Sequence, residues 1–150
     1  MLRIRPFHDA DRDPIAQMSA ARAAEAGVDA SEALREFAER WSRETVGEKD
    51  VVLVASEENK MLGFIAIFCD FEPELDAIYV VRNRRRAGIG GALLKAAALT
   101  LIRAGRTELH APDVPEDAAL DAFFLKHGGD DMDGGGYAWK ALDAAFARSA

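Results

Sequence analysis

Apolar and charged residues alternate at the start of the chain, and this pattern predicts a half-buried strand over residues 2–7. Ile15 and Met18 then lie about one helical turn apart, so the segment around them is predicted to form a helix. A second helix is predicted from Ser31 to Gly47. Its apolar residues recur at helical spacing and are expected to face the core: Leu34, Phe37 and Trp41.

Two near-continuous apolar runs, 51–55 and 62–68, are separated by a short polar segment, 57–60. Such a pair is typical of a β-hairpin. Because nearly every residue of both runs is apolar, we expect both strands to lie centrally in a sheet whose two faces are covered. A further strand is predicted over 75–81, directly before a glycine-rich turn.

The remaining predicted elements are a helix from Ala92 that ends near Gly105, a strand over 108–111, a helix opened by Asp113 or Pro115, and a last strand over 137–142. An acidic, glycine-dense connection over 128–136 precedes that last strand. The order is therefore β-α-α-β-β-β-α-β-α-β, with no repeat and no linker. We expect a single α/β (α+β) domain over residues 1–150.

Composition narrows the function classes. The chain is 49% hydrophobic and 30% charged, as in soluble globular proteins, and its net charge of −7 argues against a nucleic-acid partner. No apolar run approaches the roughly 20 residues that span a bilayer, so no membrane partner is expected. Cys69 is the only cysteine, and Met1–Arg5 lacks the apolar region of a secretory signal. These features favour the cytoplasm.

The segment Arg85–Gly91 joins the fourth predicted strand to an Ala/Leu-rich helix. The first backbone N–H groups of a helix have no carbonyl partner, and the helix dipole adds positive partial charge there. Glycines let phosphate oxygens approach these N–H groups, and the neighbouring arginines add formal charge. The turn therefore predicts a pyrophosphate-binding site, the alternative being an ordinary strand–helix turn with solvated arginines.

The spacing of the glycines distinguishes between the known kinds of phosphate-binding turn. No Lys-Ser or Lys-Thr pair follows the glycines, as a mononucleotide-binding loop would need, and Leu93 stands where a dinucleotide fold needs its third glycine. The pattern that fits is [QR]-x-x-G-x-[GA], filled by Arg85, Gly88 and Gly90. In this respect, and in the order of its elements, the chain resembles the GNAT superfamily of acyl-CoA-dependent N-acyltransferases.

The resemblance implies a central mixed, largely antiparallel sheet with helices on both faces, and acetyl-CoA as cosubstrate. It implies direct transfer of the acetyl group to a primary amine of a small molecule or peptide, and it allows a homodimer. Coenzyme-binding residues implied in this way include the strand before the turn, the turn itself and two later positions: Ile78, Tyr79, Val80, Arg85, Arg86, Ala87, Gly88, Ile89, Gly90, Gly91, Ala92, Asp117 and Phe124. Arg84 is a further source of positive charge.

Two candidates for the general base follow from the same resemblance. Glu74 falls at the position that histone-acetyltransferase members use. Glu72 and Asp76 are expected on the same face of an extended chain, so that the three carboxylates would share one edge of the site. His110, on the neighbouring strand, is the alternative, because an imidazole titrates near neutrality. For each candidate, a structural or solvated role is the competing interpretation.

The proton donor is less well defined. Many family members place a tyrosine seven residues after an asparagine and five residues before an aromatic residue. Here Phe124 replaces that tyrosine, and Asp117 takes the place of the asparagine. Phe124 has no hydroxyl, so Tyr137 or solvent would have to protonate the departing thiolate. The alternative function is a non-catalytic acyl-CoA-binding or sensing domain of the same fold.

The acidic glycine segment is also similar to part of a calcium-binding EF-hand loop, through Asp131, Asp133 and Gly134. That register would put Gly129 at the first ligand position and Lys140 at the bidentate position, where a cation would be repelled. No metal site is therefore predicted. The family resemblance instead places the segment, including Asp130, beside the acceptor, where its carboxylates would attract a cationic substrate.

Overall fold

The computed structural model describes residues 1–27, 29–41, 47–85, 87–112, 117–133 and 135–146. The first half contains β1 (Arg3–Pro6), the 3-10 turn η1 (Asp9–Asp11), α1 (Arg12–Glu25), α2 (Ala30–Arg40), β2 (Val51–Glu57), β3 (Lys60–Phe68) and β4 (Glu74–Val80). The second half contains the 3-10 turn η2 (Arg82–Arg84), α3 (Ile89–Arg103), β5 (Leu109–Ala111), α4 (Ala118–Lys126), β6 (Asp130–Asp131), β7 (Tyr137–Trp139) and α5 (Leu142–Phe146).

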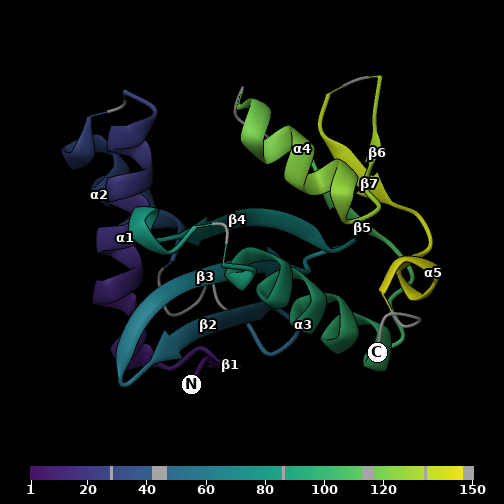
Figure 1. Cartoon of the computed structure of the whole chain (residues 1–150), viewed down its shortest axis with the longest axis horizontal. Helices are drawn as coiled ribbons and strands as arrows, with labels where there is room; N and C mark the ends of the chain where they lie inside the picture. Colours follow the sequence, from purple (N-terminus) through teal and green to yellow (C-terminus); the bar gives the residue numbers. More distant parts are fainter. Residues whose placement is uncertain (28, 42–46, 86, 113–116, 134, 147–150) are drawn as a thin grey trace.

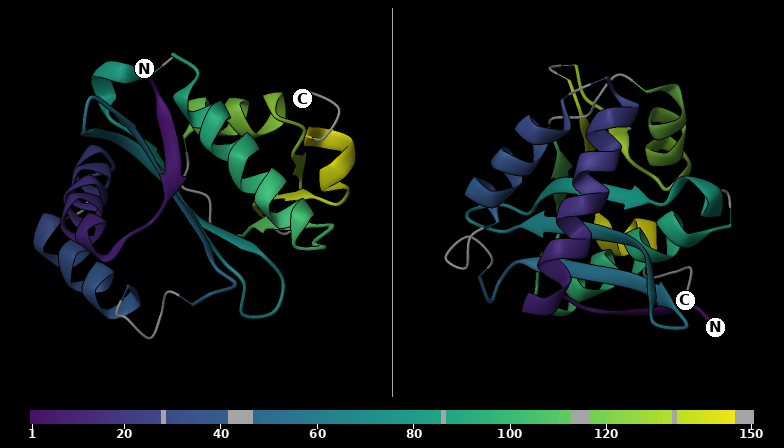
Figure 2. Two further views of the ribbon diagram at one scale, coloured as in Figure 1. Left: turned by 90° about the horizontal axis from the view of Figure 1, so that it is seen from below. Right: turned by 90° about the vertical axis from the view of Figure 1, so that its left-hand side faces the viewer.

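The strands form one sheet in the order β1-β2-β3-β4-β5-β7-β6 (Figure 1). Neighbouring strands are antiparallel except β4 and β5, which run parallel. Helices α1 and α2 cover one face of the sheet, and α3 lies on the other (Figure 2, left). The predicted fold, a mixed and largely antiparallel sheet with helices on both faces, is confirmed.

Two hydrophobic clusters fill the space between the layers. One packs Ile15, Met18 and Trp41 of the N-terminal helical region against β2, β3 and β4. The other packs α3, with Leu93 and Leu94 completely buried, against the opposite face of the same strands. Burial on both faces explains the continuous apolar character of β2 and β3, because alternate side chains of a strand point to opposite faces.

Strands β4 and β5 meet at a single paired position, Glu74 opposite His110, supported by a hydrogen bond from the His110 N–H to the Pro73 carbonyl (3.0 Å). Strand β5 ends one residue later, at Ala111. Among the described residues, therefore, no strand lies beside the edge of β4 from Asp76 to Val80. This exposed edge is the feature of the fold that positions the site.

A β-bulge interrupts β4 beside this position. Ala66 pairs with Ala77 and Ile67 pairs with Leu75, so Asp76 has no opposite residue on β3. A bulge breaks the alternation of faces. The shift falls between Leu75 and Ala77, and a shared face for Glu72, Glu74 and Asp76 stays a prediction.

Several boundaries differ from the sequence prediction. Helix α2 begins at Ala30 because the Asp29 carboxylate accepts the Ser31 N–H at 2.8 Å and so caps it, and it ends at Arg40 rather than Gly47. Leu34 is 37% exposed instead of facing the core.

At the C-terminal end, β6 lies inside the segment predicted to be a connection, and α5 follows a shorter last strand. Asp113 and Pro115, which were expected to open a helix, lie outside the described residues, as does Gly134.

Candidate active site

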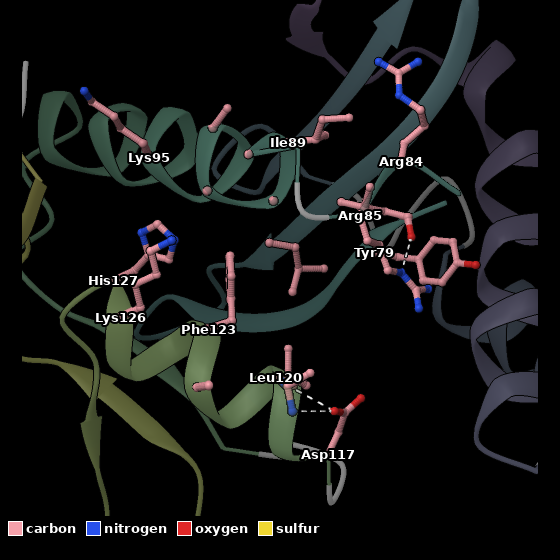
Figure 3. A pocket seen from close by; sticks show the side chains of 18 of the residues that line it. Tyr79, Arg84, Arg85, Ile89, Lys95, Asp117, Leu120, Phe123, Lys126 and His127 are labelled. Carbon is pink, nitrogen blue, oxygen red and sulfur yellow. Dashed lines mark hydrogen bonds between the residues drawn. The ribbon is translucent and has the colours of Figure 1, made fainter. Parts of the chain in front are cut away.

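A cavity of about 1220 Å³ lies between the exposed edge of β4, the start of α3, helix α4 and the C-terminal end of α1 (Figure 3). Most of the predicted coenzyme residues line it: Ile78, Tyr79, Val80, Arg85, Gly88, Ile89, Gly90, Gly91, Ala92 and Asp117. Ala87 and Phe124 do not line the cavity, and Arg86 lies outside the described residues. The strand–turn–helix unit thus forms one wall of a large pocket.

The start of α3 has the backbone geometry of an anion site. Gly88 precedes the helix in the left-handed region (φ +81°) and carries no side chain to cap it. The first helical hydrogen bond runs from the Ala92 N–H to the Gly88 carbonyl at 3.0 Å. The amides of Ile89, Gly90 and Gly91 therefore have no partner within the helix, and all three residues line the cavity.

Gly90 and Gly91 also allow α4 to approach α3. A Cβ on Gly90 would lie 3.2 Å from Cε1 of Phe123, and one on Gly91 would lie 2.9 Å from Cε1 of His127. These two aromatic rings pack together, with their centroids 4.7 Å apart, and line the cavity opposite α3 (Figure 3). Burial lowers the pKa of His127.

The residue that faces the cavity from this helix is Phe123 and not Phe124. Phe124 is 1% exposed and packs against Tyr137 and Trp139 in the core. Its expected contact with the coenzyme is therefore not supported by its position. Asp117 begins the same helix, where its carboxylate accepts the Ala119 N–H at 2.9 Å and the Leu120 N–H at 3.3 Å.

The backbone of β4 presents hydrogen-bonding groups to the cavity. The Val81 N–H donates to the Leu62 carbonyl of the β3 side at 2.8 Å. Because successive peptide groups of a strand point to opposite edges, the N–H and carbonyl groups of Val80 and Ile78 point away from β3. Both residues line the cavity, so this edge can pair with an extended amide-containing ligand.

Arg85 is held on the side of the cavity nearest α1. Its guanidinium makes two hydrogen bonds to the Glu25 carboxylate (2.7 and 3.0 Å), and its Nε donates to the Val80 carbonyl (2.9 Å). The Tyr79 hydroxyl donates to the same carboxylate at 2.8 Å. The hydrogen bonds from Arg85 lower the pKa of Glu25, whereas burial, followed by the contact with Glu25, raises the pKa of Tyr79.

The second arginine of the turn is also paired with a carboxylate. Arg84 contacts Glu57 of β2 at 3.2 and 3.4 Å, and both side chains are partly exposed. Its guanidinium is thus directed to the β2–β3 hairpin.

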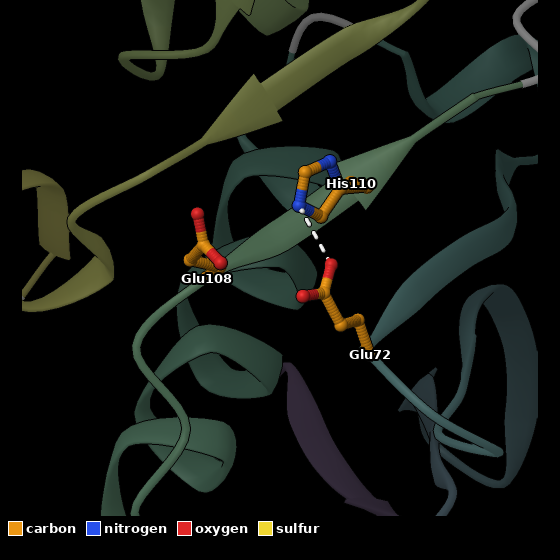
Figure 4. A group of neighbouring side chains, drawn as sticks. All are labelled: Glu72, Glu108 and His110. Carbon is orange, nitrogen blue, oxygen red and sulfur yellow. Dashed lines mark ion pairs between the residues drawn. The ribbon is translucent and has the colours of Figure 1, made fainter.

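The two base candidates, Glu74 and His110, lie where β4 and β5 meet, and neither lines the cavity. Nε2 of His110 lies 3.3 Å from a Glu72 carboxylate oxygen and is buried without a hydrogen-bond partner (Figure 4). Glu108 completes a group whose potential ligand atoms lie within 4.8 Å of one another. The structure thus brings His110 to Glu72. Burial lowers the pKa of Arg22 of α1, and the nearby Asp76 carboxylate partly offsets that effect.

Tyr137, the candidate acid, lies on β7 behind Phe124. Its hydroxyl donates to the Asp121 carboxylate at 3.0 Å, and burial raises its pKa, with Asp121 adding to the effect. It does not line the cavity. Asp130, Asp131 and Asp133 are exposed and also lie away from the cavity lining.

Sequence reasoning missed part of the lining: Arg22, Glu25, Arg82, Lys95, Lys126 and His127. Two of these residues could have been found from the sequence. Arg22 and Glu25 continue the stripe of Ile15 and Met18 along α1 at helical spacing, so charged residues on a core-facing stripe were a signal. Lys126 and His127, at the end of α4, depend on how α4 lies against α3.

Three comparisons place this geometry among known proteins. The family model described as an acetyltransferase (GNAT) domain matches residues 48–128, which is more than half of the chain. No curated protein matches the sequence. Within the described residues, no helix has the length and apolar character required to cross a membrane.

Solved structures show the same fold. PaiA N-acetyltransferase from Thermoplasma acidophilum, in complex with coenzyme A, has a TM-score of 0.73 and 20% identity over 92% of this chain and 96% of that chain. A GNAT-family acetyltransferase from Staphylococcus aureus Mu50 has a TM-score of 0.77 and 11% identity over 95% and 99%. A GNAT acetyltransferase from Brucella melitensis, in complex with acetyl-CoA, has a TM-score of 0.68 and 22% identity over 95% and 97%. The family match and the fold agree, and the chain belongs to the GNAT acetyltransferase family.

Proposed function

We propose that this chain transfers the acetyl group of acetyl-CoA to a primary amine of a small molecule or peptide in the cytoplasm. One observation carries the proposal: the unpartnered amides at the start of α3 and the exposed edge of β4 line the same cavity. A diphosphate needs the first feature, and a pantetheine chain with two amides needs the second. That two similar structures hold coenzyme A or acetyl-CoA supports the assignment.

The residues present fit the coenzyme. The amides of Ile89, Gly90 and Gly91 would bind the diphosphate. The peptide groups of Ile78 and the N–H of Val80 would pair with the pantetheine amides, since the Val80 carbonyl accepts from Arg85. Arg82 and Lys126 line the same cavity, and their positive charge would attract the phosphates. The N–H of Val80 or Ile78 would also polarise the thioester carbonyl as negative charge develops on its oxygen.

Acetyl-CoA supplies an activated carbonyl, so the chain needs to orient the amine and move its proton. The amine nitrogen forms a bond to the carbonyl carbon, the carbon–sulfur bond breaks, and the thiolate takes up a proton. Glu74 and His110 lie where β4 and β5 meet, and we propose one of them as the base. Tyr137, whose hydroxyl donates to Asp121, is the proposed donor of the proton that the thiolate takes up, and solvent is the alternative donor.

The test is turnover. Purified protein is incubated with acetyl-CoA and a panel of amines, polyamines, aminoglycosides, amino acids and peptides, while thiol release and product mass are followed together. Thiol release matched by acetylated product supports the proposal, and Glu74→Gln and His110→Gln then assign the base by which variant loses kcat. If coenzyme binds and no amine is acetylated, transfer to these amine classes is refuted.

A second function has its own supporting observation. None of the proposed proton-transfer residues, Glu74, His110 and Tyr137, lines the cavity, and Phe124 is buried in the core. This arrangement favours a domain that binds acyl-CoA without turning it over. Calorimetry would then show coenzyme binding, no amine would give product, and Glu74→Gln would leave the affinity for coenzyme unchanged.

A further inference from the structure

Glu25 is the last residue of α1, and its carboxylate connects three parts of the site. It accepts two hydrogen bonds from Arg85 of the turn and one from the Tyr79 hydroxyl of β4. Arg85 in turn donates through Nε to the Val80 carbonyl, and its guanidinium lies 5.2 Å above the centre of the Tyr79 ring. All four residues line the cavity.

We propose that Glu25 is a positioning residue for acetyl transfer, which orients Arg85 so that Arg85 fixes the Val80 edge of β4 where the pantetheine chain pairs. This inference rests on the proposed function. A bidentate arginine–carboxylate pair defines the orientation of both planes, and a third bond from Tyr79 restricts the carboxylate further. The hydrogen bond to Val80 then transmits that orientation to the strand edge.

The competing role for Arg85 is direct neutralisation of the coenzyme phosphates. Its geometry argues against that role. Nε and both terminal nitrogens are directed at Val80 and Glu25, on the α1 side of the cavity (Figure 3). Its positive charge is also balanced by Glu25 at 2.7 Å. The amides at the start of α3 and the other cationic side chains that line the cavity would instead balance the diphosphate charge.

The two roles predict opposite effects for Glu25→Gln. If Arg85 positions β4, loss of the carboxylate charge loosens the arginine and weakens coenzyme binding. If Arg85 neutralises phosphate, removing its counter-charge frees the guanidinium and strengthens coenzyme binding. The sign of the change in Kd therefore separates the two roles, independently of its size.

The same turn offers a matched control. Arg84 and Glu57 form a second arginine–carboxylate pair, at 3.2 Å, with similar exposure of the two side chains. Arg84 lines the cavity but Glu57 does not, and the two hydrogen bonds of this pair join Arg84 to Glu57 of β2 and involve neither β4 nor Tyr79. Glu57→Gln removes the same kind of interaction from the same turn without touching the strand edge.

The experiment compares wild type, Glu25→Gln, Glu25→Asp and Glu57→Gln, each shown to unfold cooperatively. Calorimetry measures the Kd of coenzyme A, and kinetics measure kcat/KM with acetyl-CoA and with S-acetylpantetheine, which lacks the diphosphate. We expect Glu25→Gln to weaken coenzyme binding about fivefold and to lower kcat/KM for both donors by the same factor, with partial recovery in Glu25→Asp. Glu57→Gln is expected to stay within about twofold of wild type.

Tighter coenzyme binding by Glu25→Gln, a loss confined to acetyl-CoA, or an equal loss in Glu57→Gln would overturn the positioning role. One measurement needs no coenzyme. Amide NMR of the free protein should show shifts at Val80 and Val81 in Glu25→Gln but not in Glu57→Gln, and unchanged shifts at both residues would refute the proposal. Failure of the wild type to bind coenzyme A would refute the proposed function instead, and the NMR result would still decide the role of Glu25.

Discussion

Gly88 and Gly105 stand at the two ends of α3 and share one backbone property. Both have positive φ (+81° and +83°), and a Cβ built on either would meet nothing within 4 Å. An alanine at either position therefore costs backbone strain without a steric clash. Only Gly88, however, lies among the residues that line the cavity.

We predict that Gly88→Ala and Gly105→Ala each lower the free energy of unfolding by about 1 kcal/mol. Coenzyme affinity should fall only in Gly88→Ala, because its strained turn carries the amides that would bind the diphosphate. Urea denaturation measures the first quantity and calorimetry with coenzyme A the second. Equal affinities for the two variants would contradict the assignment of the start of α3 as the diphosphate site.

Asp11 is the buried charged residue of the described core, at 5% exposure. Its carboxylate pairs with Arg5 at 2.7 and 2.9 Å and accepts the His8 N–H at 2.8 Å. The hydrogen bonds from Arg5 are the main reason that the pKa of Asp11 is lowered in the folded state. A carboxyl group whose pKa falls on folding contributes stability at higher pH.

We predict that Asp11→Asn lowers the free energy of unfolding at pH 7 by about 1–2 kcal/mol, a value reduced by solvent screening at the partly exposed Arg5. The difference from wild type should be constant above the ordinary carboxyl pKa of about 3.9 and disappear as the pH falls through the lower folded value. Denaturation across acid pH measures it. Asp9→Asn, which changes an exposed carboxylate 3.6 Å from Arg12, is the control and should show almost no loss.

At the scale of elements, α2 and α4 begin with the same device. Asp29 caps α2 through the Ser31 and Glu32 N–H groups at 2.8 and 3.3 Å, and Asp117 caps α4 through two N–H groups at 2.9 and 3.3 Å. Helix α2 lies on the face of the sheet opposite α3, whereas Asp117 and α4 line the cavity. A comparison of variants at the two caps therefore distinguishes an effect on helix stability from an effect on ligand binding.

We predict that Asp29→Ala and Asp117→Ala each cost about 1 kcal/mol of stability, because an alanine cannot accept the free N–H groups. Only Asp117→Ala should also weaken coenzyme binding, since it loosens the first turn of α4. Asp117→Asn keeps an acceptor oxygen and should retain both properties. A loss of affinity in Asp117→Asn would indicate that the carboxylate charge acts on the ligand directly.

The elements that the sequence predicted correctly are those with strong local signals. Apolar runs located β2 and β3, and glycines between a strand and an Ala/Leu-rich segment located the turn before α3. Strand β6 has two acidic residues and exists only because it pairs with β7, so no local pattern revealed it. The bulge at Asp76 likewise depends on how β4 pairs with β3.

The same distinction holds for the site. The amides that we propose to bind the diphosphate follow from neighbouring residues, and Ile89, Gly90 and Gly91 line the cavity. The partner of Arg85 is Glu25, 60 positions away, and the choice of Phe123 over Phe124 depends on the rotation of α4 against α3. Contacts of this range are set by packing of the whole chain, which spacing along the sequence does not encode.

At the scale of the whole molecule, the sheet has two parts that share few backbone contacts. Strands β1 to β4 form one part, and β5, β7 and β6 form the other, joined by the single pair of Glu74 with His110. The core beneath α3 spans both parts, since it contains Leu75 of β4, Leu109 of β5 and Trp139 of β7. A ligand that adds hydrogen bonds along the edge of β4 would therefore bind between the two parts.

This arrangement makes amide exchange a direct test. By strand alternation, the backbone N–H groups of Ala77 and Tyr79 point toward β3, whereas those of Ile78 and Val80 point toward the cavity. We predict that coenzyme A slows hydrogen exchange at the Ile78 and Val80 amides and leaves Ala77 and Tyr79, already bonded within the sheet, nearly unchanged. At 100 times its Kd, the ligand should add about 2.7 kcal/mol of stability and raise the Tm by about 5–10 °C. Stabilisation with equal protection at all four amides would mean that coenzyme A tightens the sheet as a whole and does not pair with the edge of β4.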